Sequence, residues 1–165
     1  MLQSILGSPT KGTIMATVRV LIADDYAAIR TALTRALESE PDIEVVGEAS
    51  DGYAAVRLAE RLRPEVVLMD VNMPGLNGIE ATRRITQEDS GVKVIGLSVH
   101  CLEFFARQML DAGARAYLLK DGDIDELIEV IEAVRKGQTY VSSAVVDSGG
   151  GRSRLKMPRR IVNRG

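Results

Sequence analysis

The sequence predicts an α/β fold in which five parallel strands form one doubly wound sheet with helices on both faces. Five short apolar runs alternate with segments whose apolar residues recur every three or four positions, a pattern typical of strands followed by helices. The runs are apolar almost throughout, as expected for strands that are covered on both sides. Short connections between successive elements favour right-handed crossovers, and hence a parallel sheet.

The first two strand–helix pairs come early in the chain. Their strands are predicted at VRVLIA (18–23) and IEVVGEA (43–49). Apolar residues four positions apart follow the first run and predict a helix that Pro41 helps to end. Segment 53–63 carries an apolar face of the same kind, and Pro64 ends it.

The third pair is separated by a loop with strong turn signals. EVVLMD (65–70) is the predicted strand, and it ends on a carboxylate. The loop VNMPGLNG (71–78) that follows contains one proline and two glycines. Asn77 and Glu80 have the spacing of a capping box, which predicts that a helix opens here and continues over 78–88.

The last two pairs complete the alternation. VKVIGLSV (92–99) is the fourth predicted strand, and a helix over about 101–111 follows it. AYLL (116–119) is a short fifth strand. A second capping box begins at Asp123 and predicts a helix that ends at Gly137.

These elements predict one domain over residues 18–137. A chain of 165 residues fits the range of roughly 100–200 residues per domain. Residues 1–17 show no sustained period and are expected to be a disordered leader. Residues 138–165 are interpreted as a linker and basic tail with no second domain, since the last 18 residues carry six Lys or Arg and no acid.

Composition excludes several classes of protein. One cysteine, Cys101, excludes an internal disulfide framework, and one histidine, His100, excludes a His-rich metal site. We expect structural or surface roles for both. No run approaches the roughly 18 apolar residues of a membrane-spanning helix, so a cytoplasmic protein without membrane contact is expected.

Charged and polar residues stand where the predicted strands end. Asp24 and Asp25 follow the first strand, Asp70 ends the third, Ser98 lies at the end of the fourth, and Lys120 follows the fifth. Ligands of open parallel sheets bind outside the carboxyl ends of the strands. The sequence therefore predicts a functional site along one edge of the sheet.

The residue types at this edge favour magnesium and a phosphoryl group. Three neighbouring carboxylates repel one another unless a cation neutralises them, and an all-oxygen ligand set favours Mg²⁺. Mg²⁺ commonly binds phosphate oxygens too. Lys120 and Ser98 are expected to bind phosphoryl oxygens, and Asp70, central in strand order, is the expected nucleophile.

The segments around these residues resemble the receiver domain of bacterial two-component response regulators. The resemblance runs from about Val18 to Arg135 and includes ADD (23–25), MDVNMPGLNG (69–78), GLSV (96–99) and AYLLK (116–120). GLSVH and AYLLKD are similar to the LuxR-type (NarL/FixJ) branch, although we expect no helix-turn-helix domain in residues 138–165. The resemblance implies the flavodoxin-like architecture of receivers.

The resemblance also implies a metal site and a phosphoacceptor. Asp70 would accept the phosphoryl group and would ligate Mg²⁺ together with Asp24 and Asp25. Asn72 would offer its backbone carbonyl to the same ion.

A switch and partners are implied as well. Ser98 and Tyr117 would form the switch, with Tyr117 turning inward on activation; an ordinary core tyrosine is the alternative. A sensor histidine kinase would donate the phosphoryl group, and the chemistry would be limited to self-phosphorylation and autodephosphorylation. The receiver would signal through a changed surface, with homodimers through the fourth helix, fifth strand and fifth helix.

Two other interpretations stay open at this stage. The first is a Mg²⁺-dependent phosphatase with an aspartyl-phosphate intermediate, but such hydrolases have a second Asp where this chain has Asn72, which cannot exchange a proton. The second is a full transcription factor that is truncated here. For this chain we expect no sequence-specific DNA binding, because the basic tail can at most attract phosphates in a salt-dependent way.

Overall fold

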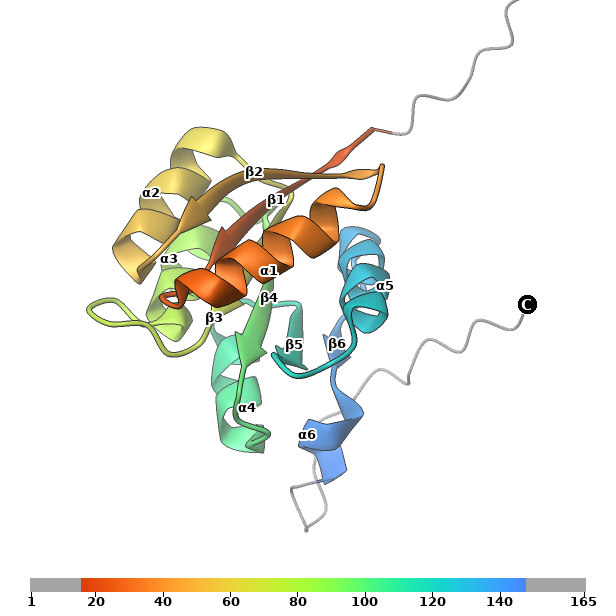
Figure 1. Ribbon diagram of the computed structural model, residues 1–165. Helices are drawn as coiled ribbons and strands as arrows, with labels where there is room; N and C mark the ends of the chain where they lie inside the picture. The colour runs from red at the N-terminus through yellow and green to blue at the C-terminus, as the bar shows by residue number, and fades with distance from the viewer. Residues whose placement is uncertain (1–15, 148–165) are drawn as a thin grey trace, which may run out of the picture.

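The computed structural model describes residues 16–147, which form a parallel sheet with helices on both faces (Figure 1). The strands lie in the order β2-β1-β3-β4-β5-β6. Their bounds are β1 Val18–Ala23, β2 Ile43–Ala49, β3 Val66–Asp70, β4 Lys93–Ser98, β5 Ala116–Leu119 and β6 Tyr140–Val141. The helices are α1 Ala27–Glu38, α2 Gly52–Leu62, α3 Gly78–Glu88, α4 Glu103–Asp111, α5 Ile124–Arg135 and α6 Ser143–Asp147. Within residues 16–147, no helix has the length and apolar character needed to cross a membrane.

Side chains of the strands alternate between two apolar cores, one on each face of the sheet. On β1, Val18, Val20 and Ile22 enter one core, whereas Leu21 and Ala23 enter the other. The first core lies beneath α1 and α5, and the second lies beneath α2, α3 and α4 (Figure 1). Burial on both faces explains why the strands are apolar almost throughout.

The predicted doubly wound α/β fold is confirmed, but the sheet has six strands rather than five. The backbone N–H groups of Tyr140 and Ser142 donate to the carbonyls of Arg115 and Tyr117, each at 3.0 Å, and so pair β6 with β5. These bonds satisfy part of an edge that would otherwise be unpaired. A strand of two residues is too short to produce a recognisable pattern, which is why the sequence did not predict it.

The folded part of the chain extends beyond residue 137, where the linker was expected to begin. Val141 and Val145 are buried in the core beneath α2, α3 and α4. The segment from β6 to α6 is therefore packed as part of the fold. Residues 1–15 of the leader expected over 1–17 lie outside the described residues, and so does the basic tail from residue 148.

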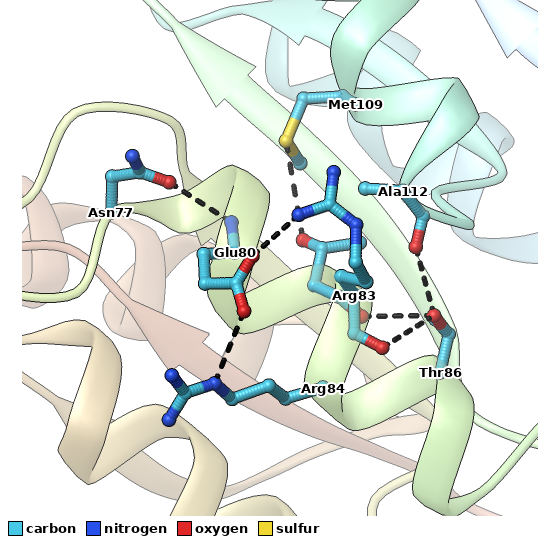
Figure 2. A network of polar contacts seen from close by, with 8 residues as sticks. Asn77, Glu80, Arg83, Arg84, Thr86, Met109 and Ala112 are labelled. Atoms are coloured by element: carbon cyan, nitrogen blue, oxygen red, sulfur yellow. Dashed lines mark hydrogen bonds and ion pairs between the residues drawn. The ribbon is translucent and has the colours of Figure 1, made fainter.

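Helices α3 and α4 are joined by a polar contact at the C-terminal end of α4. The Thr86 hydroxyl lies 2.9 Å from the carbonyl oxygens of both Thr82 and Ala112 (Figure 2). The next residue, Gly113, has a φ of 108°, and a Cβ there would lie 2.5 Å from the Thr86 hydroxyl oxygen. At its other end α4 begins after Leu102 without a side-chain cap. The C-terminal end of α4 is thus joined to α3 through Thr86.

Candidate functional site

The register of the strands brings the predicted site residues to one level. Ala23 lies beside Met69, Asp70 beside Leu97, and Ser98 beside Leu119. The residues that end or directly follow these strands therefore meet at the carboxyl edge of the sheet. Regular parallel pairing, rather than any local contact, places them together.

Asp24, Asp70 and Lys120 form a buried charged cluster at this edge. The Lys120 Nζ atom lies 2.7 Å from Asp24 Oδ2 and 3.1 Å from Asp70 Oδ1. Asp24 is 1% exposed and Asp70 is 3% exposed. Asp25 lies at the exposed rim, and one carboxylate oxygen from each of the three aspartates falls within 4.8 Å of the others. Four of the predicted site residues are thus in one place.

Burial governs the protonation of this cluster. It raises the pKa of Asp70 from 3.8 to about 6, against the opposing effect of the Lys120 ammonium, and the charge of Asp24 adds to the rise. Burial alone would lower the pKa of Lys120, but Asp24 and Asp70 outweigh it and raise that pKa above its ordinary value. Lys120 is consequently a charged group, and it faces more negative charge than it neutralises.

The loop after β1 is held by contacts that the sequence did not predict. The Tyr26 backbone N–H donates to Asp24 Oδ1 at 2.8 Å. Arg30 on α1 reaches back, and its guanidinium donates to the Asp24 carbonyl oxygen at 2.7 Å. An arginine on an amphipathic helix usually points to solvent, so no sequence signal distinguished this one.

The loop after β3 is held close to the end of its strand. The Asn72 backbone N–H donates to Asp70 Oδ1 at 3.1 Å, and the Gly78 N–H donates to the Val71 carbonyl at 2.9 Å. A Cβ atom at Gly78 would overlap the Asp70 carbonyl oxygen, so only glycine allows α3 to begin this close to Asp70. Asn77 caps α3 by accepting from Glu80 N–H at 2.9 Å, as its spacing suggested.

Ser98 and Tyr117 are linked through the backbone of His100. The His100 N–H donates to Ser98 Oγ at 3.0 Å, and the Tyr117 hydroxyl donates to the His100 carbonyl at 2.8 Å. Tyr117 is 0% exposed, and burial raises its pKa. The side chain that was expected to turn inward on activation is therefore already inside. Both contacts of His100 are made by its backbone, so its residue type carried no signal for them.

Residues 20–132 match the family model of the response regulator receiver domain, which is more than half of the chain. The chain belongs to this family. The resemblance expected from its strand-end segments is thereby confirmed, and its site residues lie inside the matched part of the receiver.

Individual relatives agree with this assignment. The receiver is 41% identical over 146 residues to the transcriptional regulatory protein DegU of Brevibacillus brevis, covering 88% of this chain and 60% of DegU. It is 44% identical over 128 residues to the transcriptional regulatory protein LiaR of Bacillus subtilis (strain 168), covering 78% of this chain and 61% of LiaR. The chain therefore spans about three fifths of the length of these curated relatives.

A solved structure agrees in fold as well as in sequence. The crystal structure of a LuxR-family two-component response regulator from Aurantimonas sp. SI85-9A1 is similar to the receiver with a TM-score of 0.76 at 36% identity. The match covers 80% of this chain and 94% of that one. The relatives are response regulators rather than enzymes in the ordinary sense, so the comparisons do not favour the phosphatase alternative.

Proposed function

We propose that this receiver accepts a phosphoryl group on Asp70 with the help of Mg²⁺ and acts as a phosphorylation-dependent switch. The observation that carries the proposal is the buried cluster of Asp24, Asp70 and Lys120 at the carboxyl edge of the sheet. A buried group of two acids and one base is poorly compensated by itself. A cation and a phosphoryl group would supply the missing partners.

The residues at this edge fit a hard divalent cation. The carboxylates of Asp24, Asp25 and Asp70 converge, and the only partner of the buried Asp24 Oδ2 among the described residues is the Lys120 ammonium at 2.7 Å, which Asp70 shares. These three side chains would hold Mg²⁺ together with the Asn72 backbone carbonyl. All four ligand atoms are oxygens, the type that Mg²⁺ prefers. When bound, the ion would neutralise charge that the carboxylates and a phosphoryl group bring together.

The chain's own groups then account for the transfer. A carboxylate oxygen of Asp70 would attack the phosphorus of a phosphohistidine, so that the new P–O bond forms as the P–N bond breaks and the leaving imidazole nitrogen takes a proton. The Lys120 ammonium, which forms ion pairs with Asp24 and Asp70 in this structure, would bind a phosphoryl oxygen. Ser98 Oγ would bind another. Loss of the phosphoryl group to water would reverse the switch.

The pairing of Ser98 with Tyr117 supports a route from this site to the surface. If Ser98 Oγ moves to a phosphoryl oxygen, its bond from the His100 N–H changes, and that residue's carbonyl holds the Tyr117 hydroxyl. The backbone between β4 and α4 would shift as a result. We therefore assign the switch to Ser98 and Tyr117, with the moving element in this connection rather than in the tyrosine ring alone.

Exposed apolar side chains surround this edge and support a protein as phosphodonor. Tyr26, Tyr53, Val99, Leu102 and Phe104 are the exposed large hydrophobic residues of the part that the structure describes. Each follows the carboxyl end of a strand, so all lie on the edge that contains recessed Asp70. A sensor histidine kinase that brings its phosphohistidine to Asp70 would cover them.

For output we propose transcriptional control and self-association. DegU and LiaR are named transcriptional regulatory proteins, and we extend that role to this receiver. The surface made by α4, β5 and α5 adjoins the Ser98–Tyr117 pair, and we propose that phosphorylation changes homodimer contacts there. Sequence-specific DNA binding is not assigned to residues 16–147.

Transfer from acetyl phosphate tests the proposal. With Mg²⁺, intact-mass measurement should find one added phosphoryl group that is stable in acid and labile in base. Asp70→Asn should abolish it, as should EDTA. The matched control is Asp42→Asn, an exposed aspartate whose carbonyl binds the first residue of β1 at the opposite end of the sheet. Full modification of Asp70→Asn would contradict the assignment.

A further inference from the structure

Arg30 on α1 contacts the loop that contains the proposed metal ligands Asp24 and Asp25, and it also contacts β2. Its guanidinium donates to the Asp24 carbonyl oxygen at 2.7 Å, and its Nε atom lies 3.7 Å from Glu48 Oε2 on β2. The Thr34 hydroxyl donates to the other oxygen of Glu48. The Arg30 side chain is 17% exposed, so it lies mostly within the protein rather than in solvent. Helix α1, the end of β2 and the loop after β1 thus share one polar network.

The contact with Asp24 complements the other contacts of that residue. Asp24 Oδ1 accepts from Tyr26 N–H and Oδ2 lies beside Lys120, so both oxygens of the side chain have a partner. Arg30 holds the backbone carbonyl of the same residue. The peptide group whose carbonyl Arg30 holds leads directly into Asp25. That residue is exposed and lacks such support, so the direction of its carboxylate depends on this peptide.

The positive charge of Arg30 lies close to the proposed cation site, and Glu48 supplies a negative charge beside it. An uncompensated positive charge near the carboxylates would oppose the binding of a dication. The carboxylate of Glu48 pairs with Arg30 through Nε at 3.7 Å, whereas a different nitrogen of the guanidinium, Nη1, donates to Asp24. The pair can thus fix the loop with little net charge.

We propose that Arg30, neutralised by Glu48, is a positioning residue for Mg²⁺: it fixes the Asp24–Asp25 peptide so that both carboxylates point at the ion. Arg30 itself touches neither the ion nor the phosphoryl group. The inference rests on the proposed function, because it concerns the same metal site. It extends that function to a residue of α1 which lies outside the set at the strand ends.

Calorimetric titration of Mg²⁺ into the full chain tests the inference. Arg30→Met should weaken Mg²⁺ binding by about tenfold, the lower end of what the loss of an outer partner costs a metal site. Arg30→Lys should rescue little, since an ammonium cannot reach both partners in the same geometry. The matched control is Arg35→Met, at an exposed arginine five residues later on the same helix; this variant should bind Mg²⁺ like the wild type.

Glu48→Gln separates positioning from charge. It retains Arg30 but removes its counter-charge, so Mg²⁺ affinity should fall at low ionic strength and recover partly in added inert salt. The loss in Arg30→Met should persist in salt. Urea unfolding of each variant in EDTA checks that the fold is intact.

The outcomes are separable from failure of the proposed function. If the wild type binds no Mg²⁺, the proposed metal site is wrong and the inference fails with it. If the wild type binds Mg²⁺ and Arg30→Met binds it equally well, only the inference is overturned. An Arg30→Met variant that loses stability but keeps wild-type affinity would likewise show a structural role and overturn it.

Discussion

Two clusters of acidic and basic side chains in this receiver differ in burial, and the pKa of an acid in each is shifted in opposite directions. On the surface of α3, Glu80 pairs with Arg83 and Arg84, and all three side chains are well exposed (Figure 2). At the carboxyl edge of the sheet, Asp24 and Asp70 share Lys120 out of contact with most solvent. Hydrogen bonds from Arg84 and Arg83 lower the pKa of Glu80, whereas burial raises the pKa of Asp70 to about 6.

The difference shows what each cluster contributes. The α3 cluster has enough positive charge and remains hydrated, so it costs little and adds little. The buried cluster has an excess of negative charge and loses hydration, which makes it unfavourable without a further partner. We infer that the α3 cluster is an ordinary hydrated surface and that the buried cluster is retained because it binds a ligand. Variants of the two clusters should therefore behave very differently.

Lys120→Ala should have the largest effect on stability. It leaves two buried carboxylates without a cation, and breaking a buried ion pair in this way costs about 3 kcal/mol or more. We expect that loss in urea unfolding at pH 7.5 in EDTA, and partial recovery in Mg²⁺. Lys136→Ala, at an exposed lysine that follows α5, is the control and should unfold like the wild type. Equal losses in the two variants would remove the distinction between buried and exposed charge.

Asp70→Asn should change stability in the opposite direction from Lys120→Ala, and by no more than that variant does. Because the folded pKa of about 6 lies above the ordinary 3.8, the folded protein binds more protons than the unfolded chain between these values. Stability is therefore lost as pH rises from about 4 to 6, by about 3 kcal/mol for a shift of this size.

The asparagine variant cannot ionise and should escape this loss. Measured in EDTA, it should match the wild type near pH 4 and exceed it above pH 6. A wild type that is more stable than Asp70→Asn at pH 7.5 without metal would contradict the unfavourable burial of this carboxylate.

Glu80→Gln should have the smallest effect. It removes the exposed acid of the α3 cluster but leaves the Asn77 cap of that helix, which binds the backbone N–H of residue 80. The urea midpoint should fall slightly at low salt and not measurably in high salt, because exposed pairs are screened. A large, salt-resistant loss would mean that this surface cluster is structural after all.

The fold and the composition of the site could be predicted because both depend on repeating patterns. Apolar strands joined by short crossovers determine a parallel sheet, and such a sheet brings Asp24, Asp70 and Lys120 to one edge whatever the loops do. The sequence contained no comparable pattern for β6, which has two residues, or for the backbone link from Ser98 through His100 to Tyr117. These features depend on tertiary contacts that no local period encodes.

Arg30 illustrates the same limit within the site. On a helical projection Arg30 is indistinguishable from the other basic residue of α1. Only the folded loop brings the Asp24 carbonyl within hydrogen-bonding distance of its guanidinium. The inward position of Tyr117 is a second example, since both a buried and an exposed ring agree with its place on β5. Residue type and spacing identify the groups that do chemistry, while their supports become visible in three dimensions.

The central claim is that the buried carboxylates are unfavourable alone and become favourable with a cation. The most direct test measures the urea midpoint of the wild type and of Asp70→Asn at pH 7.5, each in EDTA and in saturating Mg²⁺. A ligand that binds only the folded state stabilises it in proportion to its affinity. We predict that Asp70→Asn is the more stable protein in EDTA. We also predict that Mg²⁺ raises the urea midpoint of the wild type more than it raises that of Asp70→Asn. A wild type that is already the more stable protein in EDTA and does not respond to Mg²⁺ would contradict the account.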